Sequence, residues 1–272
     1  MTLISELGVT AFGAQLRQWR QRRGRSQLDL ALEADISQRH LSFLESGRAM
    51  PSREMLLHLA ERLEIPLRDR NVMLLAAGFA PAFRARTLED PAMSAVREAV
   101  SMVLKAHEPF PALAIDAKWN LVLANAALTP LLAGIEDPGL LEAPVNVLRL
   151  SLHPKGLAPR IANLPEWRRH LLHRLGQQIA ATGDTDLDGL LDELQSYPGI
   201  AAIRSVLPGI SPDPAGIFVP LRLASKDGLL SFFSTTTVFG TPLDVTMSEL
   251  AIEAFFPADD ETRLRITGSA VL

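Results

Sequence analysis

The side chains best suited to reading a nucleic acid gather between residues 26 and 48. Gln38 and Arg39 follow each other there, and these residue types form paired hydrogen bonds with the edges of adenine and guanine. Phe43 comes four residues later, where it could contact a thymine methyl or instead pack against the core. We therefore predict that this stretch contacts the bases of DNA.

Two short helices must position these side chains. Ser26 is a candidate N-cap for a helix over residues 27–34, and Ser37 is a candidate N-cap for a second helix over residues 38–45. Apolar residues spaced three and four apart predict that the second helix packs inward through Leu41 and Leu44. The residues left facing outward are Ser37, Gln38, Arg39, Ser42 and Phe43.

Further helical patterns surround this pair. Helices are predicted over residues 11–22, 53–63 and 67–77, and Gly24 and Gly78 supply stop signals. The sequence thus predicts an all-α domain of five helices within residues 1–80.

Residues 10–78 resemble the lambda-repressor-like helix-turn-helix of the XRE family. The resemblance is carried by the Ser26-Gln27 start of one helix and by the Leu-Glu-Ser-Gly-Arg exit of the next, which ends at Arg48. It implies base contacts from one set of residues, namely Gln38, Arg39 and Phe43. It implies contacts to the DNA backbone from a second set, namely Gln27, Ser37, Arg48 and the first-helix arginines Arg17, Arg20, Arg22 and Arg23.

Composition agrees with a DNA partner for the first part alone. The chain has 272 residues, of which 47% are hydrophobic, and a net charge of −4. Residues 1–86 hold 13 Arg against 9 acidic residues, a charge of +4, whereas the remainder carries −8. A chance surface imbalance is the alternative explanation.

The absence of cysteine excludes disulfides and cysteine zinc sites, and no apolar run is long enough to cross a membrane. We expect a cytoplasmic protein.

The second part of the chain mixes strand and helix patterns. Two prolines mark a linker that leads into a helix over residues 93–107, and residues 81–108 are predicted to connect the domains. Strands are predicted over residues 111–116, 119–124, 216–223, 229–237 and 249–256. Helices are predicted over residues 126–132, 144–150, 165–182 and 187–195. Strands, then helices, then strands predict an α+β domain over residues 109–272, with an antiparallel sheet that carries its helices on one side.

No catalytic or metal-binding pattern stands out in this second domain. His170 and His173 lie three apart on a predicted helix, but their basic neighbours favour a solvated face over a metal site. Ser225 and Lys226, a conceivable catalytic pair, fall in a predicted hairpin turn. We therefore predict neither an enzyme nor a bound cofactor.

An apolar lining is the most informative feature of the predicted sheet. Trp119 can serve as core or as the wall of a ligand site, and Asn125 can cap the next helix or meet a ligand. A partly hollow core between such a sheet and its helices is a usual place for a small apolar molecule. The candidate ligand residues are Trp119, Leu123, Asn125, His153, Trp167, Leu171 and Phe232.

Residues 109–265 are similar to the ligand-binding domain of MmyB-like regulators, a PAS-like fold. The similarity is carried by residues 116–125, by residues 146–150 and by Trp167 with the helix that follows. It implies a fatty-acid-like ligand. The chain departs from the family pattern over residues 152–156 and 239–246, which leaves ligand identity open. His153 or Arg160 could meet a carboxylate, and surface packing is the alternative for each.

Together these features predict a ligand-responsive transcription regulator. A homodimer would place two reading helices about 34 Å apart on a pseudopalindromic double-stranded operator. Two alternative functions remain. One is a repressor whose second domain docks a partner protein, which an exposed apolar patch would favour. The other is an enzyme with an appended DNA reader, which would need convergent polar groups in a cleft.

Overall fold

The computed structural model describes residues 2–198, 219–240 and 242–268. The chain divides into two compact units. The first comprises Met1–Thr87 together with the short segments Ala180–Gly183 and Thr241–Ser248, and the second comprises the rest. No helix within the described ranges is long and apolar enough to cross a membrane.

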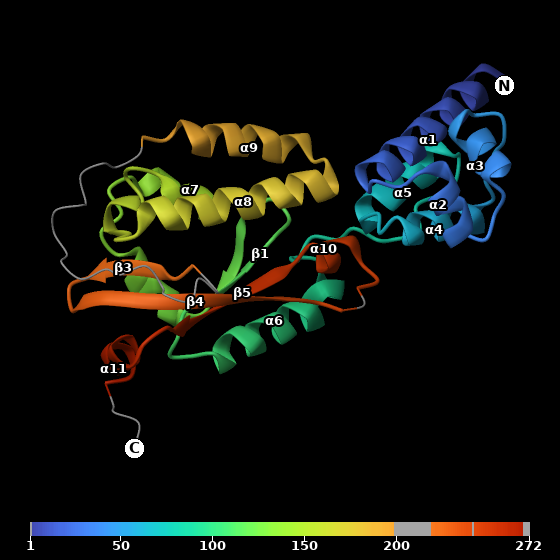
Figure 1. Ribbon diagram of the computed structural model, residues 1–272. Coiled ribbons are helices and arrows are strands. Elements are labelled where there is room, and N and C mark those ends of the chain that lie inside the picture. Colours follow the sequence, from blue (N-terminus) through green and yellow to red (C-terminus); the bar gives the residue numbers. More distant parts are fainter. Residues whose placement is uncertain (1, 199–218, 241, 269–272) are drawn as a thin grey trace. The chain divides into compact units, whose positions relative to one another are not determined.

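The first unit consists of helices packed on one hydrophobic core (Figure 1). These helices are α1 (Thr2–Arg22), α2 (Gln27–Glu33), α3 (Gln38–Glu45), α4 (Arg53–Arg62) and α5 (Leu67–Ala76). The unit also includes the short α10 (Val245–Ser248). The all-α prediction is confirmed, and the predicted inward residues Leu41 and Leu44 are fully buried. The first helix starts nine residues before its predicted start at Ala11; residues 2–10 contain no proline, and Gly8 does not interrupt the helix.

Serine caps start three of these helices. The Ser26 hydroxyl accepts a hydrogen bond from the Asp29 amide, and the Asp29 carboxylate accepts one from the Ser26 amide, which forms a capping box. Ser37 and Ser52 cap α3 and α4 in the same way, through the amides of His40 and Met55. The sequence therefore sets these helix starts locally, as predicted for Ser26 and Ser37.

The second unit is built on one antiparallel sheet of five strands. These are β1 (Ala112–Ile115), β2 (Leu121–Ala124), β3 (Leu221–Ser225), β4 (Gly228–Val238) and β5 (Ala251–Pro257). Their order is β2-β1-β5-β4-β3, so the strand that comes last in sequence lies at the centre. The α+β prediction is confirmed. The strand predicted over residues 216–223 is shifted, because β3 begins at Leu221; residues 216–218 lie outside the described residues.

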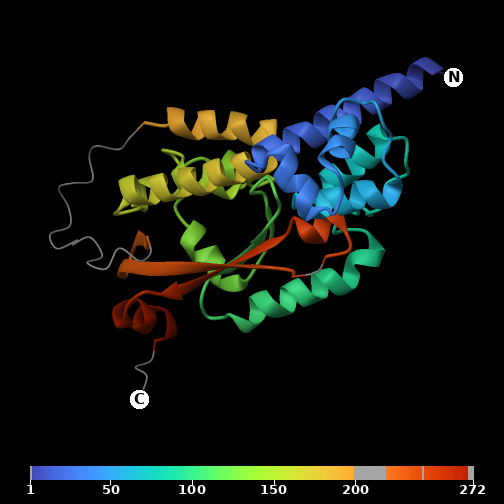
Figure 2. The same cartoon turned by 45° about the vertical axis from the view of Figure 1, so that its right-hand side comes forward.

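Helices cover both faces of this sheet, contrary to the prediction that they lie on one side (Figures 1 and 2). The helical segments are η1 (Pro91–Met93), α6 (Ser94–Ala106), η2 (Ala126–Leu132), η3 (Pro138–Leu141), α7 (Val147–Leu152), η4 (Ala158–Arg160), α8 (Leu164–Thr182), α9 (Thr185–Ser196) and α11 (Asp260–Thr267). In β1, Leu113 and Ile115 join the core that includes residues of α7, α8 and α9. Ala112 and Ala114 of the same strand join a second core with α6. Because β1 is apolar on both faces, each face must be covered.

The β1–β2 hairpin differs from its prediction at Trp119 and within β2. Trp119 lies in the turn with φ +65°, not in the strand. The register shifts between Ala114 and Ile115, so that Ile115 pairs with Leu121. This irregularity places Leu121 with the α8 side and Leu123 with the α6 side. A strand with regular alternation would have Leu121 and Leu123 on the same face of the sheet, as the sequence alone predicts.

Candidate nucleic-acid interface and ligand cavities

The outward face of α3 presents the predicted base-reading side chains. Gln38 and Arg39 are exposed, and Ser42 is half-buried beside them. The ring of Phe43 is half-buried between two arginines, with the guanidinium carbons of Arg39 and Arg48 5.3 and 5.9 Å from its centroid. Cation–π contacts of this kind hold the two arginine side chains next to Phe43 on a common surface. This surface combines hydrogen-bond donors with positive charge.

Several residues with predicted contacts to the DNA backbone have hydrogen bonds within the protein, Ser37 and Gln27 among them. The Ser37 hydroxyl caps α3, and the Gln27 amide donates to Glu45 Oε2 over 2.9 Å. Gln27 therefore joins α2 to the end of α3, and its contact with a phosphate stays a prediction. Arg17, by contrast, is exposed on α1.

Glu45 is the centre of a buried network that the sequence did not reveal. Arg20 Nε donates to Glu45 Oε1 over 2.6 Å, and Arg20 Nη2 donates to Oε2 over 2.9 Å. The two side chains are 10% and 3% exposed. These hydrogen bonds to Glu45 raise the pKa of Arg20 above its ordinary value. The resemblance implied a phosphate contact for Arg20, but its guanidinium is instead held inside by Glu45 and the Arg25 carbonyl.

The backbones of α1 and α3 meet at Gly13. A Cβ atom on Gly13 would lie 2.6 Å from the carbonyl oxygens of both Leu44 and Glu45, closer than Cβ atoms come to backbone in folded proteins. Only glycine fits there. Gly13 and the Arg20–Glu45 pair together fix where the C-terminal end of α3 lies, and so how the helix presents its outer face.

An inner cavity of about 80 Å³ lies in the core of the second unit. Three of the predicted ligand residues line it, namely Trp119, Trp167 and Leu171. Both indole N–H groups have partners, since Trp119 Nε1 donates to Gln178 Oε1 over 2.8 Å and Trp167 Nε1 donates to Ser151 Oγ over 3.0 Å. The rings are thus fixed in orientation, and their apolar faces are left for packing.

One ion pair borders this inner cavity. Glu253 of β5 lines the cavity, and its Oε1 lies 2.5 Å from Nη2 of Arg174 on α8. The guanidinium of Arg174 also lies over the Trp119 ring, 5.0 Å from its centroid. The carboxylate and the guanidinium neutralise each other, so the pair adds no net charge to an otherwise uncharged wall.

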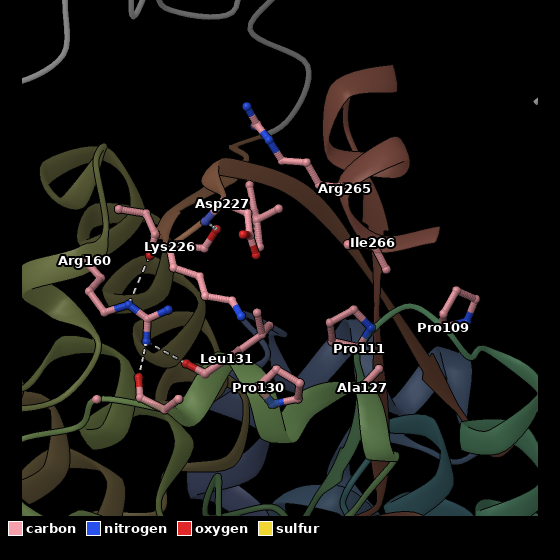
Figure 3. A pocket seen from close by; sticks show the side chains of 15 residues that line it. Pro109, Pro111, Ala127, Pro130, Leu131, Arg160, Lys226, Asp227, Arg265 and Ile266 are labelled. Carbon is pink, nitrogen blue, oxygen red and sulfur yellow. Dashed lines mark hydrogen bonds between the residues drawn. The ribbon is translucent and has the colours of Figure 1, made fainter. Parts of the chain in front are cut away.

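An outer cavity of about 730 Å³ lies where η2, η4, the β3–β4 turn and α11 meet (Figure 3). Pro111, Pro130, Leu131 and Ile266 are among its apolar walls. Its charged lining residues are Arg160, Lys226, Asp227 and Arg265. Leu131 lines both cavities. Arg160 was named from sequence as a possible carboxylate contact, whereas Lys226 was assigned only to a turn.

The other predicted ligand residues line neither cavity. Phe232 is 1% exposed within the core, and Leu123 lies on the opposite face of the sheet. His153 packs edge-on against Tyr197, with ring centroids 5.1 Å apart. Asn125 does not cap η2; its side chain accepts from the Ala112 amide and donates to the Leu104 and Phe110 carbonyls. It ties β1 to the end of α6, and its predicted capping role is wrong.

Comparisons with known proteins agree with this division. Residues 96–266 match the family model described as an MmyB-like transcription regulator ligand binding domain, and residues 16–69 match a helix-turn-helix model. A search of curated proteins found no match. Two crystal structures of the clp gene regulator ClgR from Corynebacterium glutamicum are similar to part of the chain, each with a TM-score of 0.24. The first is 35% identical, and the match covers 26% of this chain and 90% of the ClgR chain. The second is 28% identical, and the match covers 39% of this chain and 98% of the ClgR chain.

Proposed function

This chain belongs to the MmyB-like transcription regulators, DNA-binding proteins with a ligand-binding domain, and from that premise we propose that its ligand is a small apolar, fatty-acid-like molecule. Ligand binding changes the affinity for DNA if the ligand prefers one conformation or dimer geometry over another. We also propose that the protein acts in the cytoplasm, where a DNA partner would be available to it.

The observation that carries the proposal is the outer cavity with its apolar walls. Its volume of about 730 Å³ lies within the roughly 300–1,000 Å³ of known small-molecule sites. The inner cavity, at about 80 Å³, is well below that range. In this proposal the ligand therefore occupies the outer cavity.

Native mass spectrometry of the purified protein, followed by organic extraction, tests this ligand. We expect an aliphatic molecule in stoichiometric amount, and the native spectrum also reports whether the protein is a dimer. Ala127→Trp, which adds bulk to the outer wall, is expected to reduce the retained ligand. The matched Ala92→Trp change, at an exposed position of η1 that lines neither cavity, is expected to leave it unchanged. Protein that binds no aliphatic molecule, even when one is added, would favour a partner-docking domain instead.

We further propose that Gln38, Arg39, Ser42 and Phe43 face the bases of a pseudopalindromic operator. The exposure of Gln38 and Arg39 on α3 supports this assignment. In the proposal the remaining contacts go to the DNA backbone and come from Gln27, Ser37, Arg48 and Arg17. Backbone contacts position a protein on the duplex, and base contacts give it specificity.

Arg39→Ala should weaken binding to the protein's own operator by about 1–3 kcal/mol and relax specificity at one base pair. Fluorescence anisotropy on the operator and on a scrambled duplex measures both effects. Arg62→Ala, at an exposed position near the end of α4, is the matched control and should change neither affinity. An equal loss on both duplexes would make Arg39 a phosphate contact and refute its role as a base reader.

The proposed homodimer uses α6. Met102 and Val103 on this helix are 70% and 49% exposed, which is unusual for large apolar side chains on neighbouring positions. Burying them between two copies removes apolar surface from water. Two copies of α3 would then bind half-sites about one helical turn apart.

A further inference from the structure

Phe43 is a large aromatic residue that lies outside the hydrophobic core of the first unit. Within the described part of that unit it is neither one of the buried core residues nor one of the partly buried hydrophobic residues packed against them. Its neighbours on α3, Leu41 and Leu44, are by contrast fully buried. The sequence allows Phe43 either to pack inward or to contact DNA, and its place outside the core favours a role on the outer face of α3.

Two arginine side chains lie beside this ring in the free protein. The guanidinium carbons of Arg39 and Arg48 are 5.3 and 5.9 Å from the centroid of the Phe43 ring, which is half-buried. Arg39 comes four residues before Phe43 on α3, so both side chains leave the same face of the helix. Arginine side chains have apolar stems that can cover hydrophobic surface while the guanidinium groups stay in water. The groups that accompany the ring are therefore ones that a nucleic acid attracts.

The C-terminal end of α3 holds Arg48 on the same surface. Gly47 has a φ of +71°, the left-handed conformation that lets the chain turn back at the end of a helix. The amide of Arg48 then donates to the Phe43 carbonyl over 2.8 Å, and the Ser46 hydroxyl donates to the same carbonyl over 3.3 Å. The backbone thus sets the positions of Arg39, Phe43 and Arg48 relative to one another.

DNA that attracts the two guanidinium groups would uncover the ring of Phe43. Arginine pairs with the O6 and N7 atoms of guanine or with phosphate oxygens, and the 5-methyl group of thymine is the apolar group in the major groove. Base pairs two steps apart are separated by about 6.8 Å along the duplex, twice the spacing of about 3.4 Å between neighbours. A guanidinium 5.3 Å from the ring therefore reaches no further than the adjacent base pair. Because guanine pairs with cytosine, a thymine beside the ring belongs to that adjacent pair.

We propose that Arg39 and Phe43 together read a guanine and a neighbouring 5-methylpyrimidine, so that cytosine methylation at this position strengthens binding. The inference rests on the proposed base-reading role of α3 and adds which bases this pair of side chains selects. Thymine and 5-methylcytosine carry the same methyl group at C5 but differ at C4, where thymine has an acceptor and cytosine a donor. The phenyl ring of Phe43 makes no hydrogen bond with either group, so it responds to the methyl group alone.

Fluorescence anisotropy with the full-length protein tests this inference. The preferred sequence is first selected from a library of random duplexes, and we expect it to contain a thymine next to a guanine. Four duplexes then carry thymine, uracil, 5-methylcytosine or cytosine at that position, each opposite its complementary purine. Thymine should bind about 4-fold tighter than uracil, and 5-methylcytosine about 4-fold tighter than cytosine, for each methyl group involved, as the burial of one apolar carbon implies. Only the methyl group differs within each of these two comparisons.

Three variants assign the preference to Phe43. Phe43→Ser, with a short polar side chain, should bind the two members of each comparison with affinities within about 1.5-fold of each other, because the apolar contact is lost. Phe43→Leu keeps an apolar side chain and should retain most of the preference for methyl groups. Phe83→Ala is the matched control: Phe83 is also half-buried in the first unit, with the Arg70 guanidinium carbon 6.0 Å from its ring centroid, but it lies outside α3. It should leave both preferences unchanged.

The possible results separate this inference from the base-reading role on which it rests. If a preferred sequence exists but methylated and unmethylated bases bind equally, the methyl assignment is wrong and base reading by α3 stands. A preference that persists in Phe43→Ser, or that Phe83→Ala removes equally, would show that Phe43 is not the residue that reads the methyl group. A selected sequence with no thymine next to a guanine would also overturn the inference. If selection gives no preferred sequence at all, the proposed base-reading role itself is refuted.

Discussion

Gly13→Ala is expected to destabilise the first unit by about 2–3 kcal/mol, at the upper end of what overpacking usually costs. The added methyl would stand 2.6 Å from two carbonyl oxygens of the backbone, and a backbone cannot rotate away as a flexible side chain can. The end of α3 must move off α1, which shifts the proposed base-reading face and should lower affinity for DNA. Hydrogen exchange of α1 and α3 amides, measured by mass spectrometry, should accelerate about 30- to 150-fold.

Gly176→Ala is the matched control for this prediction. Gly176 also lies within a helix, α8, but no atom lies within 4 Å of the position its Cβ would take. The same substitution should therefore stabilise α8 by about 0.5–1 kcal/mol, because alanine loses less conformational entropy in a helix than glycine does. If both variants changed exchange in the same direction, the close approach of α1 to α3 would be refuted.

Glu45→Ala is expected to cost about 3–5 kcal/mol, the largest effect of any substitution discussed. It leaves the Arg20 guanidinium buried without its carboxylate and removes the acceptor of the Gln27 amide. Urea unfolding monitored by circular dichroism, together with exchange at α1 and α3, measures the loss. DNA binding should fall with it, because α3 loses its connections to α1 and α2.

The pair between Arg25 and Glu33 is the control for this second prediction. It has a similar N–O distance of 3.0 Å, but its side chains are 49% and 35% exposed. Glu33→Ala should therefore cost less than about 1 kcal/mol, as exposed ion pairs do. Equal costs for Glu33→Ala and Glu45→Ala would contradict the buried character of the Arg20–Glu45 pair.

The first unit was predictable because its signals are local. Ser26 and Ser37 are N-cap residues that mark helix starts, and Leu41 and Leu44 follow the helical period. Each of these helices can therefore be predicted from a few residues that are adjacent in the sequence. The Arg20–Glu45 pair was not predictable, since its members are 25 residues apart and charged residues are usually expected at the surface. Nothing in the sequence around Glu45 marks it as buried.

The second unit was predictable in class but not in its layers or cavities. The four residues of β1 are all buried, and an unbroken apolar run does not show that helices lie on both faces. Leu123 turned to the other face because one register shift in the hairpin breaks the alternation. The outer cavity combines residues from segments far apart in the chain, from Pro109 to Ile266, so only the folded chain brings Lys226 near Arg160.

The central place of β5 has a consequence for synthesis. Residues 1–87 leave the ribosome first and contain nearly all of the DNA-reading unit, and domains made early fold as units. The β1–β2 and β3–β4 hairpins emerge next, but only β5, at residues 251–257, joins them into one sheet. A nascent chain interrupted before Ala251 would therefore contain the DNA-binding unit but lack the central strand of the ligand-binding domain. We therefore expect late nonsense changes in such a gene to leave a DNA-binding unit without a working ligand-binding domain.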